Sequence, residues 1–127
     1  MICGLDHINI STDKLAQTRA FFIDVLGLSD GWRPDFGVPG AWLYSGERAV
    51  VHLVERDAPR TPSRQGALDH FAFAIDDFED AATKLAAHGV AFQSFDVPGS
   101  RIRQMFIEDL NGVTIELNYR PPEDARR

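Results

Sequence analysis

The chain carries Leu68-Asp69-His70-Phe71-Ala72-Phe73-Ala74-Ile75-Asp76-Asp77 and, near its start, Leu5-Asp6-His7-Ile8-Asn9-Ile10-Ser11-Thr12-Asp13. Both read Leu-Asp-His, followed by an alternating run that ends in an acidic residue, and the two histidines are 63 positions apart (His7 to His70). Each copy precedes one helix-like segment and several strand-like segments. Self-similarity of this kind predicts that one supersecondary module occurs twice.

The first module begins with an alternating segment at residues 4–11, which predicts a strand. The side chains of Ser11-Thr12-Asp13 offer N-cap chemistry for a following helix, whose apolar stripe ends before Gly27, a typical left-handed residue after a helix. Further strands are expected at residues 41–44 and 49–54, and the second of these alternates around His52.

The second module repeats this order. A strand is expected at residues 69–75, then a helix that Asp76 or Asp77 caps and Gly89 ends. Three more strands are expected at residues 91–97, 102–108 and 113–119. The pattern predicts an α+β fold of two tandem βαβββ modules, bounded as follows: module one about 4–56, a linker about 57–66, module two about 67–120, and a loose polar tail at 121–127.

Composition limits the classes of function. The 127 residues are 44% hydrophobic and 25% charged, as in an ordinary soluble globular domain. The single cysteine, Cys3, has no partner for a disulfide, and no apolar run at the start is long enough for export or for a membrane span, so we expect a cytoplasmic protein. A net charge of −6 argues against nucleic acid, and no block of like charge suggests a membrane surface.

Four polar side chains fall on the non-aliphatic faces of the expected strands: His7, His52, His70 and Glu116. His7 and His70 are on the first strands of the modules, and His52 and Glu116 are on the fourth strands, 64 positions apart. If a pseudo-two-fold axis relates the modules, all four converge.

A lone histidine in a strand is more often structural, but this coincidence favours a metal site. Imidazoles and a carboxylate bind Zn, Fe, Mn, Ni or Co, so we expect one divalent metal ion with positions left open for water or substrate.

Residues for substrate binding are less clearly marked. Arg103 is able to place a guanidinium near an anionic substrate, although an exposed strand arginine is the commoner explanation. Trp42 and Phe106 are candidates for lining an apolar pocket, or for packing the sheet. We take Trp42, Arg103 and Phe106 as the predicted substrate-binding residues.

The sequence resembles the vicinal oxygen chelate superfamily, which includes glyoxalase I, methylmalonyl-CoA epimerase, fosfomycin and bleomycin resistance proteins, and extradiol dioxygenases. The resemblance extends from Gly4 to Tyr119. It rests on four motifs: Leu5-Asp6-His7-Ile8, Phe21-Phe22-Ile23-Asp24-Val25-Leu26-Gly27-Leu28, Asp69-His70-Phe71-Ala72-Phe73, and Glu108-Asp109-Leu110-Asn111-Gly112-Val113-Thr114-Ile115-Glu116-Leu117.

This resemblance implies a glyoxalase-like fold, in which the paired βαβββ units form a mixed sheet that curls into a cup around a divalent metal. It also implies a small-molecule substrate and a homodimer, in which both chains of some members supply metal ligands. The family's ligand positions match His7, His52, His70 and Glu116. Glyoxalase I generally has glutamate where this chain has His52, and the family's turn proline is replaced by Leu110.

The leading hypothesis is therefore a metal-dependent enzyme that acts on a small substrate chelating through adjacent oxygens. Lyase or isomerase chemistry is expected, with Glu116 as the catalytic base that moves a proton next to a carbonyl. Two alternatives stay open. One is a ligand-sequestering resistance or binding protein that stacks its ligand on aromatic residues, and the other is a ring-cleaving extradiol-type dioxygenase that uses iron.

Overall fold

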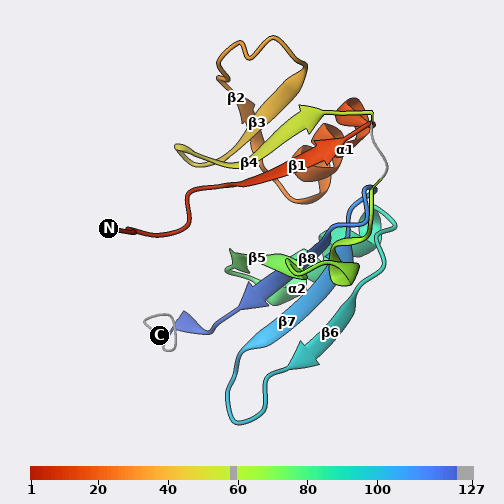
Figure 1. Cartoon of the computed structure of the whole chain (residues 1–127). Coiled ribbons are helices and arrows are strands. Elements are labelled where there is room, and N and C mark those ends of the chain that lie inside the picture. Colours follow the sequence, from red (N-terminus) through yellow and green to blue (C-terminus); the bar gives the residue numbers. More distant parts are fainter. Residues whose placement is uncertain (58–59, 123–127) are drawn as a thin grey trace. The chain divides into compact units, whose positions relative to one another are not determined.

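The computed structural model describes residues 1–57 and 60–122 and divides into two compact units, one ending at Pro59 and one beginning at Arg60 (Figure 1). The expected tail from residue 123 onward and residues 58–59 of the expected linker lie outside the described residues.

The first unit is a mixed four-stranded sheet with one helical segment. Its elements are β1 (Ile8–Thr12), α1 (Leu15–Ala20), the π-helix η1 (Phe21–Val25), β2 (Ser29–Gly31), β3 (Gly40–Ser45) and β4 (Arg48–Glu55). The strand order is β1-β4-β3-β2, in which β1 runs parallel to β4 and the other neighbours are antiparallel.

The second unit repeats this topology. Its elements are the 3-10 helix η2 (Ser63–Gln65), β5 (His70–Ile75), α2 (Phe78–Ala87), β6 (Gln93–Asp96), β7 (Arg103–Glu108) and β8 (Thr114–Tyr119). The strand order is β5-β8-β7-β6, with β5 parallel to β8. The α+β fold of two tandem βαβββ modules predicted from the sequence is confirmed, as two open, mixed four-stranded sheets.

Each sheet buries one face. In the first unit Phe22, Leu43, Val51 and Leu53 are almost wholly buried, and in the second unit Leu85, Met105, Ile115 and Leu117 are. Burying a side chain of this size stabilises a fold by about 1.5–3 kcal/mol. Because strand side chains alternate, the even-numbered residues of β4, β7 and β8 lie on the opposite face, away from this apolar core.

The two helices begin differently. Asp77 Oδ1 accepts the Asp80 N–H at 2.9 Å, which confirms the predicted cap of α2. The first helix has no side-chain cap at its N-cap residue, Lys14. Thr12 Oγ1 instead accepts the N–H of Lys14 at 2.9 Å, so the threonine ends β1 and turns the chain into the helix.

The first helical segment also ends in a way that its periodicity does not reveal. From Phe21 the backbone widens into a π turn, in which the Leu26 N–H reaches the Phe21 carbonyl. Gly27 follows with a φ of 78°, and the Leu28 N–H bonds back to the Phe22 carbonyl at 3.0 Å. This is the glycine stop expected from the sequence. No helix in the described ranges is both long and apolar enough to cross a bilayer.

Candidate metal centre

His52 and Glu116 occupy equivalent places in the two sheets. Each lies on the fourth strand of its unit, between two buried aliphatic residues, and therefore points to the face away from the apolar core. Trp42 is the cross-strand partner of His52, and Phe106 is the partner of Glu116. The repeat thus sets an aromatic residue beside each predicted metal ligand.

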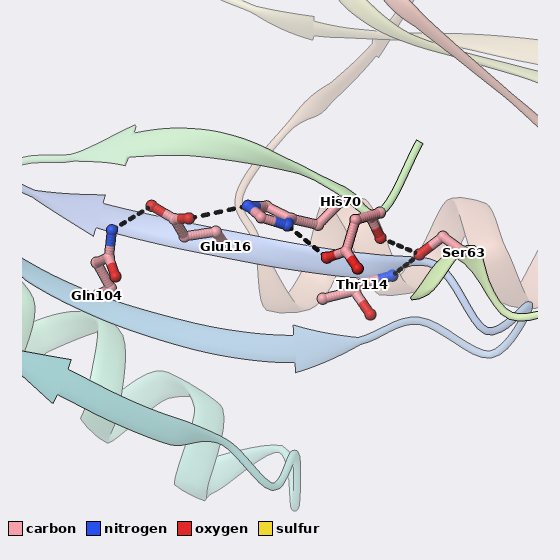
Figure 2. A network of polar contacts seen from close by, with 6 residues as sticks. Ser63, His70, Gln104, Thr114 and Glu116 are labelled. Carbon is pink, nitrogen blue, oxygen red and sulfur yellow. Dashed lines mark hydrogen bonds and ion pairs between the residues drawn. The ribbon is translucent and has the colours of Figure 1, made fainter. Parts of the chain in front are cut away.

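In the second unit, His70 and Glu116 are in direct contact. His70 Nε2 lies 3.1 Å from Glu116 Oε1, and Gln104 Nε2 donates to Glu116 Oε2 at 3.2 Å (Figure 2). In the amide orientation that satisfies both of its polar atoms, Asn118 donates to the same Oε2 at 3.2 Å. Glu116 is 7% exposed, and the amide groups of Gln104 and Asn118 offset the cost of burying its carboxylate.

The opposite nitrogen of His70 is also paired. Its Nδ1 lies 2.7 Å from Asp69 Oδ2, which favours the tautomer with hydrogen on Nδ1. Ser63 Oγ donates to the Asp69 carbonyl at 2.7 Å and accepts the Thr114 N–H at 2.8 Å (Figure 2). The segment that carries Asp69 and His70 is therefore tied to β8, the strand that carries Glu116.

The first unit repeats the aspartate–histidine contact. His7 Nδ1 lies 2.7 Å from Asp6 Oδ2, and this hydrogen bond lowers the pKa of the Asp6 carboxyl. Histidines that bind metals commonly donate their second ring N–H to a carboxylate in this way, which orients the ring and leaves the other nitrogen free. The Leu-Asp-His repeat in the sequence is thus a repeated structural device.

His52 lies between two other rings. Its centroid is 3.7 Å from that of His7, with 10° between the planes, and 4.1 Å from that of Trp42, with 16° between the planes. Burial lowers the pKa of His52, and its electrostatic interaction with His7 acts in the same direction. His52 is therefore a neutral ring at neutral pH.

The predicted substrate-binding residues separate into two groups. Trp42 and Phe106 lie on the same sheet faces as His52 and Glu116, and Phe106 meets His70 edge-on, with 5.4 Å between the ring centroids. These two aromatic residues therefore line the faces that carry the predicted ligands.

Arg103 is placed differently from what we expected. Its guanidinium lies 3.7 Å from the centroid of the Phe78 ring in α2 and pairs with Asp96 and Glu79. Because residue 103 is an odd position of β7, its side chain lies on the core-side face, opposite Glu116. The structure uses Arg103 to fasten α2 to the sheet, and we do not carry it into the proposed site.

Sequence reasoning missed Gln104, which supports the Glu116 carboxylate. A signal was present, because Gln104 and Phe106 are two residues apart on one strand and so share a face. Only the register of β7 against β8 brings that face to Glu116, and the sequence did not fix this register.

The four predicted ligands form two pairs, one within each unit: His7 with His52, and His70 with Glu116. Among the described residues, no group of three or more His, Cys, Asp or Glu side chains is assembled to hold a metal ion. The four-residue metal site therefore stays a prediction.

Similarity to known proteins agrees with this fold. Residues 4–117 match the model of the Glyoxalase/Bleomycin resistance protein/Dioxygenase superfamily. The uncharacterized protein YaeR of Escherichia coli is 30% identical over 125 residues, covering 87% of this chain and 92% of YaeR. Metallothiol transferase FosB of Staphylococcus epidermidis is 30% identical over 131 aligned positions, covering 98% of this chain and 88% of FosB.

Solved structures show the same architecture. A putative glyoxalase family protein from Bacillus anthracis superposes with a TM-score of 0.80 at 18% identity, covering 94% of this chain and 97% of that protein. A point mutant of the fosfomycin resistance protein FosX from Listeria monocytogenes, complexed with Mn(II) and 1S,2S-dihydroxypropylphosphonic acid, gives 0.76 at 20% identity over the full length of both chains. The chain belongs to the Glyoxalase/Bleomycin resistance protein/Dioxygenase superfamily.

Proposed function

We propose that this chain is a metal-dependent enzyme that acts on a small molecule chelating through adjacent oxygens. His7, His52, His70 and Glu116 are the proposed ligands of one divalent ion. The observation that carries this proposal is the contact between His70 Nε2 and Glu116 Oε1, 3.1 Å apart. Two donors at right angles around an ion with bonds of about 2.1 Å are about 3.0 Å apart, so this pair fits one ion.

The chemistry of the donors supports the same proposal. Nitrogen and oxygen donors without a thiolate suit Zn, Mn, Fe, Ni or Co. The FosX relative was solved with Mn(II) and with a compound that carries hydroxyls on adjacent carbons, in agreement with chelation through neighbouring oxygens. When bound, the ion would supply a Lewis acid that polarises the substrate oxygens.

Within this proposal, Glu116 moves the proton in a lyase or isomerase reaction. It is the only carboxylate among the four predicted ligands, and Gln104 donates a hydrogen bond to its Oε2. A positioned base of this kind contributes about 10²–10⁴-fold to a proton transfer. A substrate proton next to a carbonyl is the expected target.

A second candidate reaction is the transfer of a thiol to a small electrophile. The FosB relatives, which are metallothiol transferases, cover 98% of this chain. This reaction needs the substrate to be held and polarised, but it does not require Glu116 to remove a carbon-bound proton. The two candidates therefore differ in the role that they give to Glu116.

The decisive experiment begins with purified protein stripped by a chelator. Calorimetric titration with Mn²⁺, Zn²⁺, Ni²⁺, Co²⁺ and Fe²⁺ is expected to show one ion bound per chain. The reloaded protein is then assayed with an α-ketoaldehyde hemithioacetal, with fosfomycin plus thiols, and with catechols plus oxygen. If the only activity is cleavage of catechol rings by the iron-loaded protein, the dioxygenase alternative replaces the proposed reaction.

Two variants sharpen this experiment. E116Q is expected to weaken ion binding and to abolish turnover, whereas E108Q, which changes an exposed carboxylate of the same sheet, keeps both. A protein that binds no divalent ion, or an E116Q variant with unchanged turnover, contradicts the proposed function.

One structural feature favours the alternative of a ligand-sequestering protein. Trp32 and Phe36 are 71% and 57% exposed, and their ring centroids lie 5.7 and 6.2 Å from that of Trp42. Such a cluster is able to stack against a planar ligand without a metal. Binding of an aromatic ligand can be followed by the quenching of tryptophan fluorescence. Equal quenching in H70A and in metal-stripped wild type, without turnover, would favour this alternative.

We also propose a homodimer as the working form, in line with the resemblance described above. In this form the two pairs, His7 with His52 and His70 with Glu116, have two ways to complete a site: within one chain or between two chains.

A further inference from the structure

We propose that His52 is not a ligand of the ion but a positioning residue that holds the ring of His7. This inference rests on the metal site proposed above and narrows it to His7, His70 and Glu116. Its basis is the stacked geometry of the His7 and His52 rings within the first unit.

Stacked imidazoles do not converge on one ion. The lone pair of an imidazole nitrogen lies in the plane of its ring, so a shared ion has to lie near both planes. The two ring centroids are 3.7 Å apart and the ring planes are inclined by only 10°, so an ion about 2.1 Å from a nitrogen of one ring and in its plane lies well out of the plane of the other. In this arrangement His7 or His52 is a ligand, but not both.

His7 is the better suited of the two. Its Nδ1 is paired with Asp6, just as Nδ1 of His70 is paired with Asp69, and this contact leaves Nε2 available to an ion. His52, in contrast, has a ring against each of its faces, His7 on one side and Trp42 on the other. It completes a stack rather than a coordination sphere.

The sheet register fixes this stack. Trp42 and Asn9 are the partners of His52 on the two neighbouring strands. His7 lies two residues before Asn9 and so returns to the same face. Asp6 contacts the edge of the His7 ring, and His52 packs against its face. Together these contacts restrict the rotation of the ring and the tilt of its plane.

The second unit shows what a ligand at the same position looks like. Glu116 places its carboxylate 3.1 Å from His70 Nε2, the ring nitrogen that is not paired with Asp69. His52 instead covers the face of His7. One position of the repeat therefore serves coordination in one module and support in the other.

Zinc binding to full-length wild type, H52F, H52A and H7A tests whether His52 positions His7 or binds the ion itself. Phenylalanine keeps a flat ring in the stack but has no donor atom. We expect the Kd for Zn²⁺ to stay within about threefold of wild type in H52F and to rise about 10–100-fold in H52A, as is usual when a residue that orients a ligand is lost. H7A loses a ligand and binds more weakly than H52A. Circular dichroism and thermal unfolding confirm that each variant folds.

Nitrogen chemical shifts of labelled histidines give a readout independent of activity. On zinc addition, His7 and His70 are expected to shift as ligands and His52 to keep the shift of a free ring. An H52F variant as weak as H7A, together with a metal-type shift of His52 in wild type, overturns the inference.

A wild-type protein that binds no zinc contradicts the proposed metal site instead. The positioning role is then judged on metal-free protein. Stacking predicts upfield-shifted ring protons of His7 in wild type and in H52F but not in H52A, and equal shifts in all three overturn it.

Discussion

His70 Nε2 lies 3.1 Å from Glu116 Oε1, although 46 positions separate the two residues in the chain. The parallel pairing of β5 with β8 brings them together, because it sets Thr114 opposite His70 and Glu116 opposite Ala72. Glu116 is thus two residues beyond the partner of His70 on β8, and both side chains lie on the same face of the sheet. Half of the proposed metal site is consequently formed by the local topology of one module.

Replacing Asp69 by asparagine should loosen the orientation of His70. Asp69 Oδ2 accepts from His70 Nδ1 at 2.7 Å, and an amide in that place gives a weaker hydrogen bond. We expect D69N to weaken Zn²⁺ binding about 10–100-fold, with a smaller effect on folding stability. Calorimetric titration measures the change. D76N, an exposed substitution just after β5, is the matched control. Equal zinc affinity in D69N and wild type would show that Asp69 does not orient the ligand.

Replacing Arg103 by glutamine should affect stability and leave the proposed site alone. The guanidinium stacks on Phe78 and pairs with two exposed carboxylates, those of Glu79 and Asp96. Exposed ion pairs contribute about 0–1 kcal/mol each, and the stacking adds about 0.5–1 kcal/mol. Urea unfolding should therefore show R103Q to be less stable by about 1 kcal/mol. Zinc affinity and turnover should not change, and a substrate-specific rise in KM would restore Arg103 as a binding residue.

The lowered pKa of His52 predicts a pH dependence of stability in the metal-free protein. The unfolded chain takes up the proton of this histidine near pH 6.5, whereas the folded protein takes it up only at lower pH. The contribution of His52 is therefore fully present above pH 6.5 and is lost as the pH falls through the folded pKa. Unfolding in urea at pH 7.5 and pH 5.5 should show a smaller loss in H52F than in wild type. An equal loss in both would assign the acid sensitivity to other groups.

A homodimer that shares ligands between chains should allow complementation. H7A and E116Q are each expected to be inactive. When the two are mixed and allowed to exchange subunits, a site assembled from both chains recovers up to one quarter of wild-type activity, because one dimer in two is mixed and holds one intact site. Light scattering on the same samples measures the mass. A mixture that stays inactive while subunits exchange, shown by tagged chains, would indicate that each chain completes its own site.

The sequence predicted the features that follow from local periodicity. Alternation around His70 and Glu116 gave the strands and the faces of their side chains, and the glycines gave the ends of the helices. Periodicity does not distinguish the π turn at Phe21 from α-helix, since both place the apolar residues on one side. Arg103 and Phe106 were both predicted to bind substrate, but they are an odd and an even position of the same strand, so alternation alone places them on opposite faces.

The ring stack was beyond sequence reasoning for a similar reason. His7 and His52 have the residue types of metal ligands, and their spacing repeats that of His70 and Glu116. Their parallel orientation arises from packing against Trp42, a cross-strand contact that only coordinates reveal. Residue type thus predicted which positions can carry a metal ligand, but not which of these side chains is oriented to bind the ion.

A neutral imidazole at residue 52, where the other module has a carboxylate, has an electrostatic consequence. In the proposed site a dication is balanced by one formal negative charge, so an excess of one positive charge remains among the ligands. A monoanionic guest, such as a carboxylate or a singly ionised phosphonate, would bring that total to zero. Glutamate at position 52 would remove the excess and with it part of the attraction for such a guest, so in the proposed site this one side chain would help to set the charge of the molecules that bind.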